Sequence, residues 1–327
     1  MLPRIKSLEW LLLGCVAVLP AGVSAQSWKP SKPMTIVVPV APGSSTDMMG
    51  RLLAERLPAL LGQTVVVRNN TGASGLIGAA NVARADPDGH TLLLSASTLL
   101  GAPHVLPAGA SSNVDVVKDL TPVTISAASP LVVFANPDLG VNNPKALVAY
   151  LKNNPGLAYG SSGNGSPQHI GGQLFMKATG TEMTHVPYKG LVPAITDTMA
   201  GQIKLSFGAL GGFGQHIDAG RLVPVAVAEK TRSPFLPNTP TFTESGIEGV
   251  EMNVFFPVFA PAGTPPEAIQ ALNQAINKII TEPAVKARMG EQGVETLGTS
   301  VDDAKKAVND EYERYARVVK EFGIKAQ

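Results

Sequence analysis

The chain has 327 residues, with 26 Lys and Arg against 25 Asp and Glu, and a formal net charge of +1. A charge so close to zero argues against nucleic acid or an anionic membrane surface as a partner. The single cysteine, Cys15, falls in an N-terminal leader, so disulfides, thiol catalysis and cysteine-based metal sites are excluded from the rest of the chain. The length suits two domains of ordinary size.

The first 25 residues have the three regions of a signal peptide. Arg4 and Lys6 are positive, residues 11–18 are apolar, and Val23-Ser24-Ala25 is a small-residue cleavage site. The apolar run is too short to span a bilayer comfortably. We therefore predict export to the periplasm, with cleavage after Ala25. A lipoprotein signal ending at Cys15 is the alternative, and it is disfavoured because it would leave an apolar segment at the new terminus.

The next segment predicts a strand, a turn and a helix. Residues 35–38 are a β-branched run typical of a strand, and Pro42-Gly43 breaks it. Ser44 is placed to cap the following helix, with Asp47 as its capping-box partner three residues later. Apolar residues recur at helical spacing up to Gly62, although Pro58 should bend this helix or weaken its last turns.

The same alternation continues along the chain and predicts an α/β fold. Because strand and helix alternate, we expect parallel strands with right-handed crossovers. A second unit of this kind begins near residue 129. The predicted strands after the first are 64–67, 91–95, 131–135, 157–160, 184–188, 203–207, 223–227 and 255–260, and helices occupy most of the intervals and residues 264–322.

No catalytic motif accompanies these elements. Metalloprotease, serine-hydrolase, P-loop and dinucleotide-binding signatures are missing, and the five histidines lack metal-ligand spacing. Ser44, Asp47, Ser166 and His169 could assemble into a nucleophilic set, which leaves a hydrolase as an alternative. Serine-rich turns beside a histidine are far more often capping devices. The sequence therefore predicts no enzyme, no cofactor and no metal site.

Three Gly- and Ser-containing turns each open a predicted helix, at 43–47, 161–169 and 188–193. Such turns are common wherever a strand connects to a helix, so any one of them has a purely structural interpretation. A helix N-terminus also attracts anions through its free backbone N–H groups. Three of them at the carboxyl ends of parallel strands favour a ligand site.

At this point the chain resembles the Bug/TctC family, the periplasmic solute-binding proteins of tripartite tricarboxylate transporters. The resemblance covers essentially the whole mature chain. It is carried by KPMTIVVPVAPGSSTD (32–47), DPDGHTLL (86–93), YGSSGNGSPQHIGGQLF (159–175), HVPYKG (185–190) and FAPAGTPPEAI (259–269). It implies a two-lobed Venus-flytrap fold of the type II kind, with a mainly parallel sheet in each lobe. It also implies a small carboxylate bound between the lobes by backbone N–H groups, hydroxyls and water.

On this basis we expect lobe 1 to combine residues 26–127 with 252–327, and lobe 2 to span residues 128–251. The expected partners are the carboxylate and integral membrane transporter subunits, with the chain acting as a monomer. A membrane sensor in place of the transporter is the alternative. The expected ligand-binding residues are Gly43, Ser44, Ser45, Thr46 and Asp47 from lobe 1, and Ser161, Ser162, Asn164, Ser166, His169, Tyr188, Lys189, Gly190 and Asp197 from lobe 2.

Several positions depart from the family pattern, among them Val40, Ser44 and the segment 70–72, and two of the departures bear directly on the cavity. Lys204 stands where the family often has an acidic residue, and Gly208 where a polar residue facing the ligand is expected. The acidic and polar side chains that the family pattern places at the cavity floor are therefore missing from these two positions. Their absence disfavours an amino-acid ligand, whose ammonium group needs an acidic partner. Dicarboxylates, tricarboxylates, aromatic acids and amino acids all remain open.

Overall fold

A computed structural model describes residues 28–107, 109 and 113–326. The predicted leader and its cleavage site lie outside these residues. The strands are β1 Met34–Val38, β2 Val65–Asn69, β3 Thr91–Leu94, β4 Leu120–Ala135, β5 Leu157–Ser161, β6 Met183–Pro187, β7 Leu205–Ala209, β8 Val223–Val227, β9 Asn253–Pro261 and β10 Glu295–Thr296. The α-helices are α1 Ser45–Leu61, α2 Leu76–Ala83, α3 Thr98–Val105, α4 Pro144–Asn153, α5 Pro167–Thr179, α6 Leu191–Met199, α7 Gly214–Asp218, α8 Pro266–Ile280, α9 Pro283–Gly290 and α10 Val301–Phe322.

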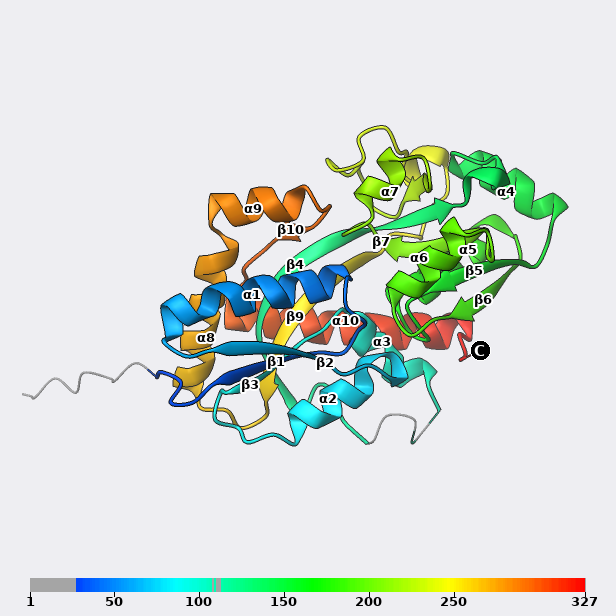
Figure 1. Cartoon of the computed structure of the whole chain (residues 1–327). Coiled ribbons are helices and arrows are strands. Elements are labelled where there is room, and N and C mark those ends of the chain that lie inside the picture. The colour runs from blue at the N-terminus through cyan, green and yellow to red at the C-terminus, as the bar shows by residue number, and fades with distance from the viewer. Residues whose placement is uncertain (1–27, 108, 110–112, 327) are drawn as a thin grey trace, which may run out of the picture.

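The strands form one continuous sheet in the order β2-β1-β3-β9-β4-β7-β5-β6, and β8 and β10 also pair with β4. Figure 1 shows two halves that meet along β4 and β9. We call β1 to β3 with α1, α2 and α8 the first half, and β5 to β8 with α4 to α7 the second half. Strand β4 runs through both, because its first part pairs with β9 and its last part with β7 and β8.

The alternation of strands and helices confirms the predicted α/β class. The sheet contains both parallel and antiparallel strand pairs. Three outer strands are parallel in each half, β2-β1-β3 and β6-β5-β7. The shared strands β4 and β9 are antiparallel to each other and to their outer neighbours. The reversal arises because both strands connect the halves and are not part of a helix-linked repeat.

Helix α1 begins where the sequence predicts. Ser44 has extended backbone angles and its hydroxyl accepts a hydrogen bond from the backbone N–H of Asp47 at 3.2 Å. The helix continues through Pro58, and Gly62 ends it with a left-handed φ of 76°. Its apolar side chains, Met49, Leu52, Leu53 and Leu57 among them, are buried. Burial of this face, worth about 1.5–3 kcal/mol for each such side chain, therefore anchors the helix and its N-terminus.

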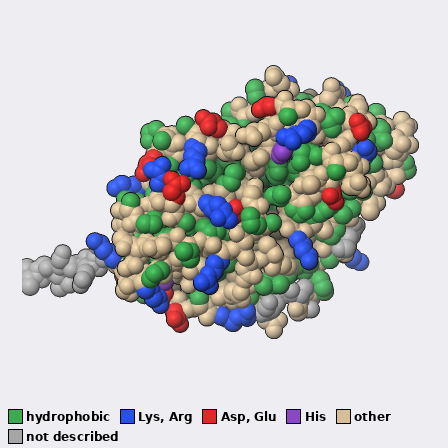
Figure 2. All heavy atoms as spheres, in the orientation of Figure 1, with side chains coloured by type: hydrophobic (Ala, Val, Ile, Leu, Met, Phe, Trp, Pro, Cys, Tyr) green, Lys and Arg blue, Asp and Glu red, His purple; other side chains and the backbone are tan. Residues whose placement is uncertain are grey.

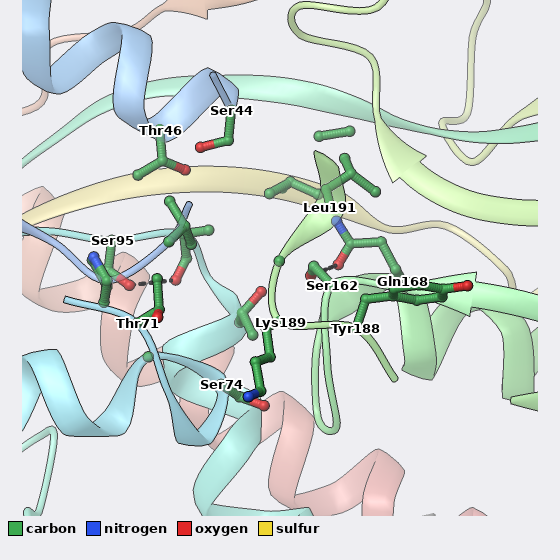
Figure 3. Close-up of a pocket in the computed structure, with 18 of the residues that line it drawn as sticks. Ser44, Thr46, Thr71, Ser74, Ser95, Ser162, Gln168, Tyr188, Lys189 and Leu191 are labelled. Atoms are coloured by element: carbon green, nitrogen blue, oxygen red, sulfur yellow. Dashed lines mark hydrogen bonds between the residues drawn. The ribbon is translucent and has the colours of Figure 1, made fainter. Parts of the chain in front are cut away.

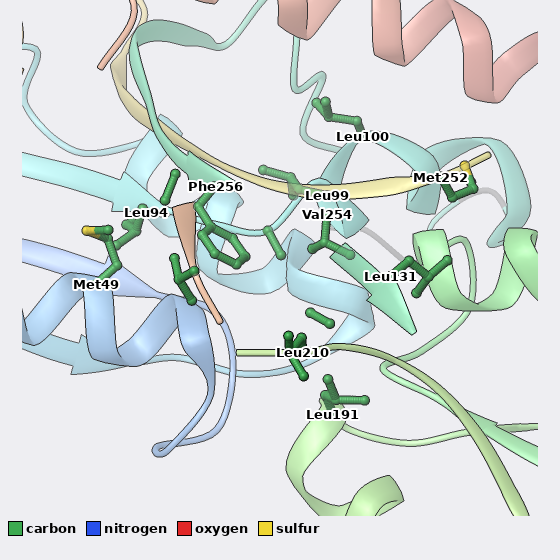
Figure 4. Close-up of a cluster of buried hydrophobic side chains, with 14 of the residues drawn as sticks. Met49, Leu94, Leu99, Leu100, Leu131, Leu191, Leu210, Met252, Val254 and Phe256 are labelled. Carbon is green, nitrogen blue, oxygen red and sulfur yellow. The ribbon is translucent and has the colours of Figure 1, made fainter. Parts of the chain in front are cut away.

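The hydrophobic core is continuous between the two halves. Figure 4 shows Met49 and Leu94 of the first half, Leu131 and Val254 of the shared strands, and Leu191 of the second half in one cluster. Helix α10 packs against α3 and β4 and also contacts α5, so it ties the halves together (Figure 1). On the face drawn in Figure 2, acidic and basic side chains are interspersed. Within the described ranges, no helix has the length and apolar character needed to cross a bilayer.

Candidate functional site

A cavity of about 760 Å³, including its open mouth, lies between the two halves. Its lining comes from the segments that follow β1, β2, β3, β5 and β6, and from the ends of β7 and β9. The site therefore lies at the carboxyl ends of the parallel strands, where ligands of open α/β sheets bind. It is lined by Pro39, Val40, Ser44, Ser45, Thr46, Thr71, Gly72, Ala73, Ser74, Gly75, Ser95, Ala96, Thr98, Ser162, Gln168, Tyr188, Lys189, Gly190, Leu191, Ala209, Val254 and Phe256 (Figure 3).

The N-terminus of α1 presents hydrogen-bond donors to this cavity. The hydroxyl oxygen of Ser44 already accepts the N–H of Asp47, so its own hydrogen remains free to donate. The backbone N–H groups of Ser45 and Thr46 occupy the first helical positions, where no carbonyl four residues earlier is available within the helix. The hydroxyl of Ser45 donates to the carbonyl of Gly211 at 2.9 Å and joins α1 to the loop after β7.

Asp47 holds this turn from behind and does not line the cavity. Its buried carboxylate accepts hydrogen bonds from Arg51 Nε at 2.9 Å, Asn69 Nδ2 at 2.8 Å and the backbone N–H of Gly43 at 3.0 Å. Burial alone would raise the pKa of the Asp47 carboxyl, but these three hydrogen bonds and the Arg51 charge lower the pKa below its ordinary value. Asp47 and Gly43 therefore hold the turn together and lie outside the cavity lining, and their expected contact with a ligand stays a prediction.

The second half contributes the start of α5. Ser166 is its N-cap and accepts the N–H of His169 at 3.1 Å, so its hydroxyl serves the helix and lies off the cavity lining. The hydroxyl of Ser162 donates to Oε1 of Gln168 at 2.9 Å. Both side chains line the cavity, and the Gln168 amide nitrogen points away from Ser162 (Figure 3). Gln168 thus supplies a donor that the sequence interpretation missed.

His169 and Ser161 are buried beside this loop and do not reach the cavity lining. Ser161 Oγ lies 2.6 Å from His185 Nε2, and His169 Nδ1 accepts the N–H of Gly165 at 3.2 Å. Burial lowers the pKa of His169 to about 4 and that of His185 to about 3. The structure therefore gives no support to the expected ligand roles of Ser161 and His169, which stay predictions. The serine–histidine pair that does form lies in the core, closed to a substrate.

The third predicted turn, at the start of α6, does line the cavity. Tyr188 donates its phenolic hydrogen to Asp197 Oδ2 at 2.7 Å, and burial together with that carboxylate raises the pKa of Tyr188 to about 12. Asp197 orders this wall from outside the lining, and its expected contact with a ligand stays a prediction. Lys189 is exposed at the mouth, and Gly190 is the N-cap of α6.

Of the fourteen residues expected to bind ligand, Ser44, Ser45, Thr46, Ser162, Tyr188, Lys189 and Gly190 line the cavity. Asn164 lies outside the lining, with Gly43, Asp47, Ser161, Ser166, His169 and Asp197. The largest group that sequence reasoning missed is 71–75, although its Gly-Ala-Ser-Gly turn was a visible signal. Ala73 and Ser74 have φ of 45° and 53°, a strained left-handed conformation that clusters at functional sites.

The structure also places the two unusual positions. Lys204 precedes β7, 3.7 Å from Asp138, and is not part of the lining. Gly208 is buried within β7, where an added Cβ would lie 3.0 Å from side-chain atoms of Leu191 and Phe134. Gly208 is not among the residues that line the cavity, and a side chain at this position would have to displace Leu191 or Phe134 by a few tenths of an ångström.

The lining favours an anion. Among the described residues that line the cavity, Lys189 carries the one formal charge. Helices α1, α2, α3, α5 and α6 all begin at it, and each helix N-terminus carries a partial positive charge. Within the described ranges no three His, Cys, Asp or Glu residues gather in a metal-binding arrangement.

Comparison with known proteins agrees with this geometry. Residues 49–324 match the sequence model of the tripartite tricarboxylate transporter family receptor, TctC. BugT of Bordetella pertussis is 36% identical over 312 residues, which cover 94% of each chain. The R. palustris protein Rpa4515 with adipate has a TM-score of 0.86 at 34% identity, covering 90% of this chain and 99% of that one. MatC from Rhodopseudomonas palustris with bound malate has a TM-score of 0.83 at 27% identity, covering 89% and 99%.

These matches confirm the predicted family and the predicted fold class of periplasmic binding proteins. The family is one of periplasmic receptors that bind solutes and are not enzymes, which confirms the prediction that the chain lacks catalytic activity. The chain therefore belongs to the TctC/Bug family of tripartite tricarboxylate transporter receptors.

Proposed function

We propose that this protein captures a small carboxylate in the cavity between its halves and delivers it to the membrane subunits of a tripartite transporter. The single observation that carries the proposal is the lining itself, which brings together five helix N-termini and Lys189 with no carboxylate among its described residues. Such a surface attracts an anion and places several N–H and O–H donors around it.

The carboxylate lies between donors from both halves in this proposal. The Ser44 hydroxyl and the backbone N–H groups of Ser45 and Thr46 contact it from the first half. The Gln168 amide and the backbone at Gly190 contact it from the second half, while Lys189 attracts it at the mouth. Several hydrogen bonds at about 1 kcal/mol net each, with two helix termini, are enough for a micromolar Kd, about −8 kcal/mol.

The relatives support this assignment. Rpa4515 has been solved with adipate and MatC with malate, so carboxylates occupy proteins of this fold. We propose export to the periplasm, cleavage after Ala25 and action as a monomer. The proposed lobes are residues 26–127 with 252–327, and residues 128–251. The first boundary falls inside β4 and the second immediately before β9, so the two crossings lie side by side.

A carboxylate panel tests the binding step by thermal shift of the purified protein. A ligand at about 100 times its Kd adds about 2.7 kcal/mol, which raises the melting temperature by several degrees. Thr46→Val keeps the shape of the side chain and the backbone N–H, and it removes the hydroxyl that lies at the cavity (Figure 3), so it should weaken binding measurably. Thr196→Val serves as the control because Thr196 is on α6, and its hydroxyl donates to Val192 outside the cavity. A panel in which no carboxylate shifts the melting temperature would contradict the proposal.

Delivery needs a separate measurement. Cells that contain the membrane subunits should take up the labelled ligand when this protein is present and fail to do so when it is deleted. Normal uptake without it, combined with retained ligand binding in vitro, would indicate that the protein reports to a sensor.

A further inference from the structure

The loop after β7 joins the first turn of α1 to strand β4 through three consecutive hydrogen bonds. The Ser45 hydroxyl donates to the carbonyl of Gly211 at 2.9 Å. The N–H of Gly211 donates to Ser129 Oγ at 3.1 Å, and the Ser129 hydroxyl donates to the carbonyl of Gly293 at 3.0 Å. Both serines are buried. We call these three hydrogen bonds the serine network.

The serine network connects the two halves at the place where β4 passes from one to the other. Ser45 belongs to α1 of the first half, and Gly211 follows β7 of the second half. On β4, Ser129 pairs with Val254 of β9, and two residues later Leu131 pairs with β7. Ser45 lines the cavity, whereas Gly211 and Ser129 lie outside the lining. The network therefore links a cavity residue to the shared strand.

Close packing fixes the middle of the serine network. A Cβ at Gly211 would lie 2.3 Å from Ser45 Oγ and 2.6 Å from Val294 Cγ2, and both of these side chains are buried. The neighbouring N–H of Gly212 donates to the carbonyl of Gln292 at 3.0 Å. The loop after β7 is thus held between the first turn of α1 and the segment 292–294. Buried hydrogen bonds that share partners in such a site support one another.

The network holds Ser45 by its side chain and leaves its backbone N–H at the first position of α1, where no carbonyl of the helix accepts it. Ser45 and Thr46 are consecutive, so a shift of the first turn of α1 displaces the N–H groups of both. Hydrogen bonds weaken steeply when their distance and angle change. The position of the α1 donors relative to those of the second half therefore depends on the anchoring of Ser45.

We infer that Ser129 and Gly211 are positioning residues for ligand capture, although neither lines the cavity. They act through Ser45, because the serine network fixes the first turn of α1 against the second half and lets the donors of both halves reach one carboxylate. This inference rests on the proposed carboxylate binding and adds to it residues outside the cavity.

A double-mutant cycle tests the inference by calorimetry on the purified full-length mature protein. The probe is the tightest-binding member of a panel of malate, adipate, citrate, glutamate and benzoate. Ser129→Ala should raise Kd about five- to tenfold in the parent protein, and less than about twofold in a Ser45→Ala background, where the network is already broken.

An equal rise of Kd in both backgrounds, or no rise in the parent background, would overturn the inference and leave carboxylate capture intact. A panel in which no acid binds the parent protein would overturn the proposed function and this inference with it.

Ser206→Ala is the control for Ser129→Ala. Ser206 is equally buried, lies on β7 outside the lining, and its hydroxyl contacts the Thr198 hydroxyl and the carbonyl of Ala194, all within the second half. Its removal should cost stability without changing Kd more than about twofold. Equal changes of Kd in Ser206→Ala and Ser129→Ala would show a general effect of buried serines and overturn the inference.

A second matched pair tests Gly211 by adding one methyl group. Gly211→Ala places the methyl against Ser45 and should raise Kd at least about tenfold. Gly214→Ala adds the same methyl at the start of α7, where nothing lies within 4 Å, and should leave Kd unchanged. Equal values of Kd in the two variants would overturn the role of Gly211. Thermal unfolding without ligand checks that each variant folds, and if Gly211→Ala does not, the Ser129 cycle decides.

Discussion

The imidazole rings of His169 and His185 are stacked, with centroids 3.9 Å apart and an interplanar angle of 7°. They join the first turn of α5 to β6, close to the loop that carries Ser162. Both rings are buried, and His169 Nε2 and His185 Nδ1 have no hydrogen-bond partner within the described residues. Neutral rings tolerate this arrangement, whereas a proton on either ring would place a charge in the core beside the other ring.

The stability of the protein should therefore fall on acidification through these histidines. Burial lowers the pKa of His169 to about 4 and of His185 to about 3, against about 6.5 in the unfolded chain. With the folded pKa depressed, their contribution is complete above pH 6.5 and is lost as the pH falls toward 4. The slope is up to about 1.4 kcal/mol per pH unit for each histidine.

Urea unfolding at several pH values between 7.5 and 4.5 measures this loss. His169→Gln removes one titrating ring, so the free energy of unfolding should depend less steeply on pH than in the parent protein. His216→Gln is the comparison variant, because His216 lies on α7 and outside the buried pair. Burial and the charge of Arg221 lower the pKa of His216 to a smaller extent, so its removal should flatten the pH dependence less than His169→Gln does. Equal pH dependence in the parent and His169→Gln would contradict the prediction.

Gly101→Ala should weaken ligand binding without touching the ligand. Gly101 of α3 meets Gly165 of the second half so closely that a Cβ at Gly101 would lie 2.0 Å from the Gly165 carbonyl oxygen. The methyl group must push α3 away from the loop 161–166, so the two sides of the cavity cannot approach as they do here. Because alanine favours the helix over glycine by up to about 1 kcal/mol, the loss should not come from α3 unfolding.

We expect at least a tenfold increase in Kd for Gly101→Ala in calorimetric titrations. Gly290→Ala, on α9, is the matched control because its Cβ would lie 3.6 Å from Phe235, an ordinary contact. Unchanged affinity in Gly101→Ala would show that this approach of α3 and the loop is not needed for binding.

Gln168→Glu should abolish most carboxylate binding. The change replaces the amide donor with an anion of the same shape at the cavity wall, and the Ser162 hydroxyl can still donate to it. The ligand-induced rise in melting temperature should disappear at pH 7.5. Gln215→Glu introduces the same charge at an exposed position of α7 and should leave the rise unchanged. If the ligand raised the melting temperature of Gln168→Glu as much as that of the parent protein, the Gln168 side chain would not be part of the binding site.

Asp47→Ala should destabilise the fold by about 2–4 kcal/mol in denaturant unfolding. It leaves Asn69 and the N–H of Gly43 without their acceptor, and removes the partner of Arg51 from a buried position. Asp310→Ala, which breaks the exposed ion pair with Lys306 on α10, should cost less than about 1 kcal/mol. Equal losses in the two variants would contradict the structural role given to Asp47.

The sequence by itself determined the local signals. Ser44, Asp47 and Gly62 predicted both ends of α1, because capping groups and a left-handed glycine act within a few residues of each other. The turns at the starts of α1, α5 and α6 were predicted for the same reason. The sequence also predicted that the site would attract an anion. This prediction depends on helix N-termini, which are local features, and needs no residue from a distant part of the chain.

Only the tertiary structure decided how these signals are combined. The first part of β4 escaped prediction because Pro122 and Pro130 interrupt its pattern, and it forms because β9 pairs with it across a register shift beside Pro122. Which serines face a ligand, and that Gln168, Val254 and Phe256 join them, follows from contacts between residues far apart in the chain. A buried Val or Phe has the same local pattern whether it faces the core or a cavity, so only packing distinguishes the two.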